Sequence, residues 1–240
     1  MLLRRMSERT RKAEPISGVR GRFPADIIFF DNDGTVFDSS TGVLTAVQEG
    51  FREFNARHGL NLPVPTVERI KELTGTPSTV FFPAVLPEEV RHLAPDLRED
   101  CLRHEVAAIR ATGRLFEGAR EMLTELRARG KKLVLVTHAG PEYLAATAEA
   151  FGYPELFDAM YHVGLHGLSD KAAMMAHALN ALGLNGAPLV AVGDKAADIA
   201  AGKANGAACV FCAYGFGTEE DADGADAVIH APLELLPLVE

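Results

Sequence analysis

The chain has 240 residues, 48% of them hydrophobic and 24% charged, which suits one globular domain with a sizeable insertion, or two small domains. Its net charge of −9 argues against a nucleic-acid or anionic-membrane surface, and no apolar run approaches the roughly 20 residues of a membrane helix. The three cysteines are an odd count without framework spacing, so a disulfide scaffold is not expected. We therefore expect a cytoplasmic protein with no nucleic-acid or membrane partner.

The N-terminal segment, residues 1–22, is rich in arginine and has no sustained apolar periodicity. This composition predicts a disordered basic tail. A mitochondrial or chloroplast transit peptide is the alternative, but Glu8 and Glu14 fit poorly with one.

The first predicted strand is the short apolar run 27–30, and two carboxylates follow it in the sequence Asp31-Asn32-Asp33-Gly34. Ligands bind at the carboxyl ends of strands in open parallel sheets. Asp is rare near buried strands unless it is paired or bound to a metal, so these two residues suggest a divalent cation with oxygen ligands. An ordinary Asp-Gly turn is the alternative for this motif alone.

Residues 38–112 show helical spacing throughout, interrupted by prolines. Val43, Val47, Phe51 and Phe54 fall on one face of the first predicted helix, and residues 69–73 and 97–109 are predicted to be helical as well. Because no strand is indicated here, the pattern predicts an all-helical insertion.

From residue 113 onward, helices and strands alternate, which predicts parallel βαβ units and a three-layer, Rossmann-like sheet. Cys209 and Cys212 lie in one of these strands, where residues three apart point to opposite faces, so we expect two buried thiols and no redox or zinc site. The predicted helices span 118–129, 141–151, 171–182 and 196–205, and the predicted strands span 133–137, 158–163, 189–192, 208–213 and 227–229.

Three further polar motifs follow these elements: Thr137-His138 after the second strand, Lys171 at the start of a helix, and Asp194 to Asp198 after a later strand. Together with Asp31-Asn32-Asp33-Gly34, and in this order, they resemble the motifs of the haloacid dehalogenase (HAD) superfamily. The resemblance extends from about residue 23 to the C-terminus. It implies a HAD-like α/β core formed by residues 23–37 and 113–240, with residues 38–112 as the helical cap of the phosphoglycolate phosphatase and β-phosphoglucomutase branch.

The resemblance implies a nucleophilic role for Asp31, which would form an aspartyl-phosphate, and an acid–base role for Asp33. Gly34 would bring the backbone close to the phosphate, and Thr137 would contact it, although Thr137 could instead cap the following helix. His138 would contact the substrate or, as the alternative, point to solvent. Lys171 would offset the charge of the phosphoryl oxygens. Asp33 also favours phosphoesters, since dehalogenases and phosphonate-cleaving members lack an Asp at the matching position.

The implied cofactor is Mg²⁺, held by the Asp31 carboxylate, the Asp33 backbone carbonyl and Asp194. Asp198, one helical turn beyond Asp194, would orient the metal site or Lys171. Asn32 and Lys195 depart from the usual residues of the family at their positions, and we expect Asn32 to point away from the two aspartates.

Specificity is expected to come from the cap. The segment 73–78, with Gly75 and Thr76, resembles the cap loop that reaches the active site in this branch. Its hydroxyl groups suit a small polar leaving group, and Arg69 and Lys71 are the nearby cationic candidates.

The sequence therefore predicts a Mg²⁺-dependent phosphatase of a small phosphorylated metabolite, similar to phosphoglycolate phosphatase. A phosphomutase of the β-phosphoglucomutase kind and a catalytically weak binding or scaffold protein remain as alternatives. A monomer and a dimer are both compatible with the sequence.

Overall fold

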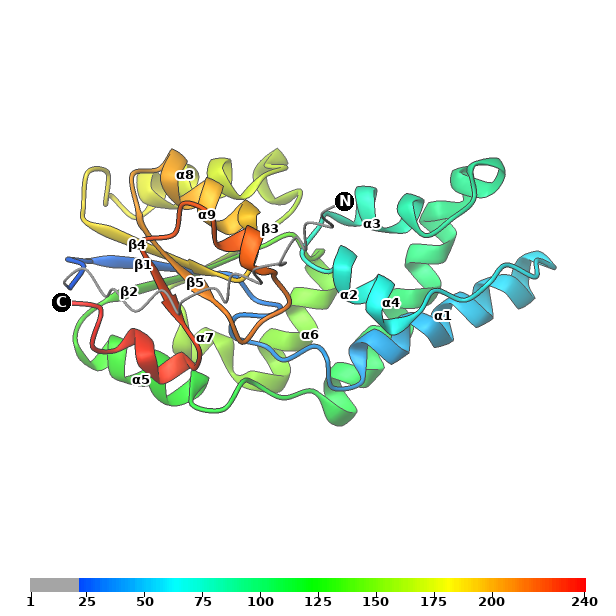
Figure 1. Ribbon diagram of the computed structural model, residues 1–240, viewed down its shortest axis with the longest axis horizontal. Helices are drawn as coiled ribbons and strands as arrows, with labels where there is room; N and C mark the ends of the chain where they lie inside the picture. Colours follow the sequence, from blue (N-terminus) through cyan, green and yellow to red (C-terminus); the bar gives the residue numbers. More distant parts are fainter. Residues whose placement is uncertain (1–21) are drawn as a thin grey trace, which may run out of the picture.

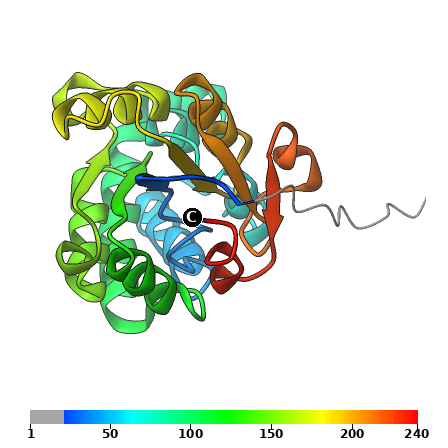
Figure 2. The ribbon, with the colours of Figure 1, turned by 90° about the vertical axis from the view of Figure 1, so that its left-hand side faces the viewer.

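The computed structural model describes residues 22–240, so the predicted basic tail lies almost entirely outside the described residues. Within them, six parallel strands form one sheet in the order β3-β2-β1-β4-β5-β6 (Figures 1 and 2). The predicted strands are confirmed. Their bounds are β1 Ile27–Phe30, β2 Lys132–Thr137, β3 Ala159–His162, β4 Leu189–Gly193, β5 Ala208–Cys212 and β6 Ala227–Ile229.

Helices cover both faces of the sheet, because alternate residues of each strand point to opposite sides. Ile28 and Phe30 of β1 pack in the cluster that includes α5 and α7, whereas Ile27 and Phe29 pack in the cluster that includes α8 and α9. The result is the predicted three-layer α/β fold, visible in Figure 1 with β1 between the two helical layers. These helices are α5 Ala119–Ala128, α6 Pro141–Phe151, α7 Tyr153–Leu156, α8 Lys171–Ala181 and α9 Ala196–Ala204.

The sheet is well suited to a ligand site because β1 is central and pairs with β2 on one side and β4 on the other. Parallel strands place all their carboxyl ends at one edge, and the chain order reverses at β1. The polar motifs that follow β1, β2 and β4 therefore meet at this edge. Cys209 and Cys212 are buried free thiols in clusters on opposite faces of the sheet, as predicted.

The insertion after β1 is helical, as predicted, and extends from the carboxyl edge of the sheet (Figure 1). Its hydrophobic cluster includes Val47, Phe51, Phe54, Ile70 and Leu97, so these helices have a core of their own. A helix at 78–84 and a 3-10 segment at 88–93 were not anticipated from the sequence. The elements are α1 Val43–His58, α2 Val67–Leu73, α3 Ser78–Ala84, η1 Glu88–Leu93 and α4 Ala94–Thr112.

Two chain crossings join this helical cap to the core. Phe37 forms an antiparallel bridge with Leu115, and the Asp38 amide donates to the Arg114 carbonyl at 3.0 Å. A small apolar cluster that includes Phe37, Ile109 and Tyr143 packs between the cap and α6. Along the described part of the chain, no helix is long and apolar enough to cross a membrane. The remaining 3-10 segments are η2 Leu165–Gly167, η3 Glu219–Ala222 and η4 Pro232–Leu235.

Candidate active site

Asp31 follows the last residue of β1 and is almost fully buried at the carboxyl edge of the sheet. Its Oδ1 atom lies 2.7 Å from the Lys171 ammonium group. Its Oδ2 atom is buried and has no hydrogen-bond partner among the described residues. Since a buried carboxylate oxygen without a partner is costly, this atom indicates a ligand that the protein alone does not supply.

Lys171 is the first residue of α8, after Asp170, whose side chain caps the helix by accepting from the Ala173 amide. Its ammonium group also lies 2.6 Å from Asp198 Oδ1. Burial opposes the positive charge, but Asp198 and Asp31 outweigh it and raise the pKa of Lys171. The lysine is therefore charged and held between two carboxylates.

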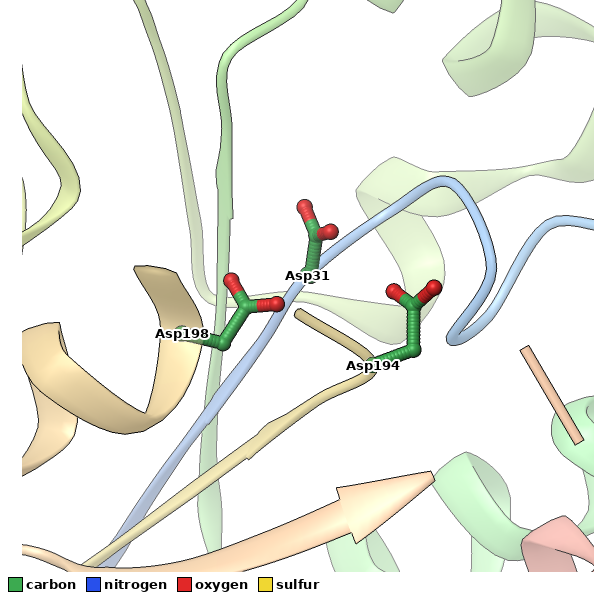
Figure 3. A group of neighbouring side chains, drawn as sticks. All are labelled: Asp31, Asp194 and Asp198. Atoms are coloured by element: carbon green, nitrogen blue, oxygen red, sulfur yellow. The ribbon is translucent and has the colours of Figure 1, made fainter. Parts of the chain in front are cut away.

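Asp194 follows β4 and completes a cluster of three buried carboxylates with Asp31 and Asp198, seen in Figure 3. One oxygen from each of the three lies within 4.8 Å of the others. Asp194 Oδ2 accepts the Phe216 amide at 2.7 Å, and Asp198 Oδ2 accepts the Lys195 amide at 3.0 Å. These backbone bonds fix the orientation of both side chains.

Gly34 has a φ of +83° and packs directly against Asp194. A Cβ atom at this position would lie 2.3 Å from Asp194 Oδ2, so only glycine fits between the β1 loop and the cluster.

The cluster is electrostatically unfavourable without a cation. Burial, followed by repulsion from the other carboxylates, raises the pKa of Asp31 well above its ordinary value, although Lys171 opposes this. Burial and the nearby Asp198 raise the pKa of Asp194 to about 7. Carboxylate oxygens are the ligands that hard divalent cations prefer, and Asp31 Oδ2 has no donor within residues 22–240. The residues present therefore fit a bound divalent cation. Asp198 uses both oxygens on Lys171 and Lys195, which is consistent with its expected orienting role.

Asp33 lines the same cavity as Asp31 and is held by hydrogen bonds that the sequence did not reveal. The Tyr143 hydroxyl donates to Asp33 Oδ1 at 2.5 Å. The Asn32 side-chain amide donates to Asp33 Oδ2 at 3.1 Å and accepts the Tyr153 hydroxyl at 2.8 Å. Burial raises the pKa of Asp33, and the bonds from Tyr143 and Asn32 oppose that shift.

The expectation that Asn32 points away from the aspartates is therefore wrong. Its side chain is fully buried, and it needs hydrogen-bond partners there, which Asp33 and Tyr153 supply.

Thr137 and His138 follow β2 and also line the cavity. The Thr137 hydroxyl accepts the Ala139 amide at 3.0 Å, so it stabilises the loop, whereas Gly140 occupies the N-cap position of α6. The His138 Nδ1 atom lies 2.8 Å from the Gly75 carbonyl. Because a carbonyl only accepts, His138 donates, and the bond ties the core to the cap.

The cap loop brings Gly75 and Thr76 to the cavity, where the sequence placed them. The Thr76 hydroxyl donates to the Leu73 carbonyl at 2.7 Å. The two cationic candidates are elsewhere: Arg69 pairs with Glu72 on an exposed face, and the Lys71 ammonium lies 5.5 Å from the centre of the Phe216 ring. Neither residue lines the cavity that holds Asp31 and Asp33.

The charged side chains of the cap that line this cavity are Arg98 and Glu105, both from α4. With Leu102 they are spaced at i, i+4 and i+7, which places them on one helix face. This spacing was the available sequence signal. It was missed because a polar helix face ordinarily meets solvent.

The fold and the carboxylate cluster define a three-layer α/β enzyme with a helical cap over the carboxyl edge of its sheet. A family model described as haloacid dehalogenase-like hydrolase matches residues 25–206. The chain therefore belongs to the haloacid dehalogenase-like hydrolases, and the family together with phosphatase-named relatives supports a phosphatase.

The chain is similar to two named relatives and to one solved structure, among others. It is 30% identical over 222 residues to a phosphoglycolate phosphatase from Chromobacterium violaceum, covering 89% of this chain and 96% of that protein. It is 29% identical over 200 residues to a 5'-nucleotidase from Pseudomonas aeruginosa, covering 81% and 85%. A haloacid dehalogenase-like family hydrolase from Streptococcus pneumoniae superposes with a TM-score of 0.74 at 25% identity, covering 90% and 97%.

Proposed function

We propose that the protein is a Mg²⁺-dependent phosphatase that hydrolyses a small phosphorylated metabolite through an aspartyl-phosphate, with chemistry like that of phosphoglycolate phosphatase. The observation that carries the proposal is the state of Asp31. One carboxylate oxygen is held by Lys171, and the other is buried with no hydrogen-bond partner in the described part of the chain. Asp31 and Asp33 line the same cavity.

In the first step, an Asp31 oxygen attacks phosphorus, and the bond from phosphorus to the leaving oxygen breaks. Asp33 gives its proton to that oxygen, so the alcohol leaves in neutral form. Burial supports this role because it raises the pKa of Asp33, and Tyr143 and Asn32 hold the carboxyl group in one orientation.

In the second step, Asp33 takes a proton from water as the water oxygen attacks phosphorus, and the bond from phosphorus to Asp31 breaks. Phosphate leaves, and both side chains return to their starting states. Lys171 stabilises the negative phosphoryl oxygens in both steps. Thr137, His138 and the backbone at Gly34 are the proposed phosphate contacts, and Gly75 and Thr76 the proposed cap contacts.

Asp31, the Asp33 carbonyl and Asp194 would hold the cation, which would neutralise phosphate charge and orient the substrate. Asp198 would position Lys171, to which it is hydrogen-bonded.

Both named relatives remove phosphate, but their names imply different leaving groups: glycolate carries a carboxylate, whereas a nucleoside carries no charge at its sugar. Release of phosphate from a panel that contains 2-phosphoglycolate and nucleoside 5'-monophosphates, measured with Mg²⁺ and again with excess chelator, tests the proposal. We expect turnover with Mg²⁺ and its loss in chelator. Full activity without divalent cations would overturn the metal assignment, and phosphoryl transfer between substrate hydroxyls without release would favour a mutase.

A further inference from the structure

The cap side of the active-site cavity is mostly apolar, although Thr74, Thr76 and Ser78 of the cap loop also line it. The Thr74 and Thr76 hydroxyls already donate to backbone carbonyls of the cap. The cavity has a volume of about 110 Å³, and its cap wall includes Val43, Leu44, Val47, Ile70, Phe81 and Phe82. In the proposed reaction the phosphoryl group lies at Asp31, so the leaving group would lie against this wall. Apolar walls bind apolar bodies by removing both surfaces from water.

The charged side chains on this wall do not favour an anion. Arg98 is 42% exposed, and its Nη2 atom lies 3.7 Å from the carboxylate of Glu142 on the neighbouring core helix. Glu105 is an acid. On the core side, burial lowers the pKa of His138, which favours its neutral imidazole. The cavity therefore offers an anionic leaving group one half-exposed arginine beside Glu142, the cap-loop hydroxyl groups, and the carboxyl group of Glu105.

A second carboxylate on the substrate would be placed among apolar side chains, where an unpaired anion is costly. An ionised Glu105 would repel it, and a protonated Glu105 would offer a single neutral donor. The ionised form therefore disfavours an anionic leaving group, and the protonated form offers it one hydrogen bond but no positive charge.

We propose that this phosphatase selects phosphate monoesters whose leaving alcohol is uncharged and has an apolar body, and that Glu105 is a specificity-determining side chain. The inference rests on the proposed function, whose reaction it narrows to one substrate class. It separates this chain from enzymes that act on short anionic phosphoesters such as 2-phosphoglycolate.

Glu105 also has a positive role toward such a substrate. Burial is the main cause that raises the pKa of Glu105 to about 8, and the nearby Asp33 adds to it. A raised pKa favours the protonated carboxyl, which donates one hydrogen bond and accepts others. It therefore matches a hydroxyl, amide or ring nitrogen on an otherwise apolar alcohol.

Two matched pairs of substrates test the selectivity at pH 7 with Mg²⁺. The first pair is phenyl phosphate and 4-carboxyphenyl phosphate, and the second is 2-hydroxyethyl phosphate and 2-phosphoglycolate. Within each pair the main difference is one carboxylate. We expect kcat/KM to be at least about tenfold higher for the uncharged member of each pair, since tenfold corresponds to one modest unpaired-charge penalty.

The role of Glu105 is tested by Glu105→Lys. This variant should lower the kcat/KM ratio of the uncharged to the carboxylate substrate by about tenfold or more, because the lysine supplies a positive charge for the carboxylate. The control is Glu99→Lys, the same charge change on an exposed face of the same helix, and it should leave the ratio unchanged. Leu102→Lys places a charge at another position of the wall, so it should act like Glu105→Lys if that variant does not fold.

Three results would overturn the inference. Preference of the wild type for the carboxylate member of either pair, lost in Arg98→Gln, would show that Arg98 binds an anionic leaving group. Equal kcat/KM ratios within the substrate pairs for the wild type, Glu105→Lys and Leu102→Lys, with all three proteins folded, would show that the charge of the cap wall does not affect substrate selection. Release of phosphate from none of the four substrates would overturn the proposed function itself, and the inference with it.

Discussion

The core wall and the cap wall of the active-site cavity are built on opposite principles. On the core side, Asp31 lines the cavity, and Lys171, Asp194 and Asp198 form a charged cluster with it. All four are buried, and bonds to each other or to the backbone fix their positions. On the cap side, apolar side chains dominate, and the two charged residues come from a single helix. Fixed charges at strand ends suit a reaction that needs preorganised groups. The apolar side chains of the cap lie on separate helices, so they can be replaced without moving the charged groups of the core.

The two walls also contribute differently to stability. The charged cluster of the core side holds three buried carboxylates and one lysine, which pairs with Asp31 and Asp198. The raised pKa of Asp31 and of Asp194 indicates that this cluster is unfavourable without a further cation. The cap instead buries aromatic and aliphatic side chains in its own cluster, which stabilises the fold by the hydrophobic effect. Substitutions on the core wall should therefore affect activity more than stability.

The largest effect is expected at the core wall for Asp31→Asn. An amide is a poor nucleophile, so kcat should fall on the order of 10⁴-fold or more, while the fold is retained. Phosphate release and a thermal melt measure the two quantities. Asp26→Asn is the matched control, since Asp26 is exposed and directly precedes the opposite end of the same strand. Retention of a tenth of the wild-type rate by Asp31→Asn would exclude Asp31 as the nucleophile.

Tyr143→Phe tests how the core wall holds the acid–base group. The hydroxyl donates to Asp33 and so favours its ionised form, and its removal should raise the pKa of Asp33. We expect a loss of about tenfold in kcat/KM, the size of one charged hydrogen bond, and a pH profile displaced to higher pH.

Tyr153→Phe is the control for this effect, because that hydroxyl bonds Asn32 and reaches Asp33 only through it. A rate loss for Tyr143→Phe with an unmoved pH profile would mean that Tyr143 serves packing alone.

The contrast between the walls also explains what the sequence could reveal. Asp31, Lys171 and Asp194 follow strands or begin helices, and those positions are set by short local patterns that place them at one edge. The parallel sheet and the helical cap follow from the same periodicities.

The Asp33 network was not predictable in the same way. Its members lie at positions 32, 143 and 153, and each alone resembles an ordinary buried or turn residue. Arg98 and Glu105 were hidden for another reason: helical periodicity shows which face is polar, but it does not show whether that face meets solvent or a cavity.

Gly75→Ala tests the contact between the walls. Gly75 has a φ of +94°, its carbonyl binds His138, and a Cβ atom would lie 3.1 Å from Lys195 Cγ. Gly59→Ala is the control, since Gly59 has a φ of +62° with nothing within 4 Å. Both variants should lose roughly 1 kcal/mol of stability from backbone strain.

Only Gly75→Ala should also lose activity, by about fivefold in kcat/KM, because the loop must shift away from the cavity. Equal activity in the two variants would mean that the loop does not position the substrate.

The smallest effect is expected on the cap wall, in the pH dependence of stability for Glu105→Gln. The pKa of Glu105 is about 8 in the folded protein and near its ordinary value of 4.5 in the unfolded chain. Between these values the folded state binds the extra proton, so this residue lowers stability as pH rises from about 4.5 to about 8. Glutamine does not titrate. The free energy of unfolding of Glu105→Gln, relative to that of the wild type, should therefore increase by about 1 kcal/mol from pH 5.5 to pH 8.5. This value is smaller than the full pKa shift implies, because the side chain faces the cavity and solvent screens its charge. Urea unfolding at the two pH values measures the gain, and the exposed Glu99→Gln should show none. A flat difference for Glu105→Gln would mean that Glu105 is hydrated and ionised throughout, and that the cap wall carries a fixed negative charge.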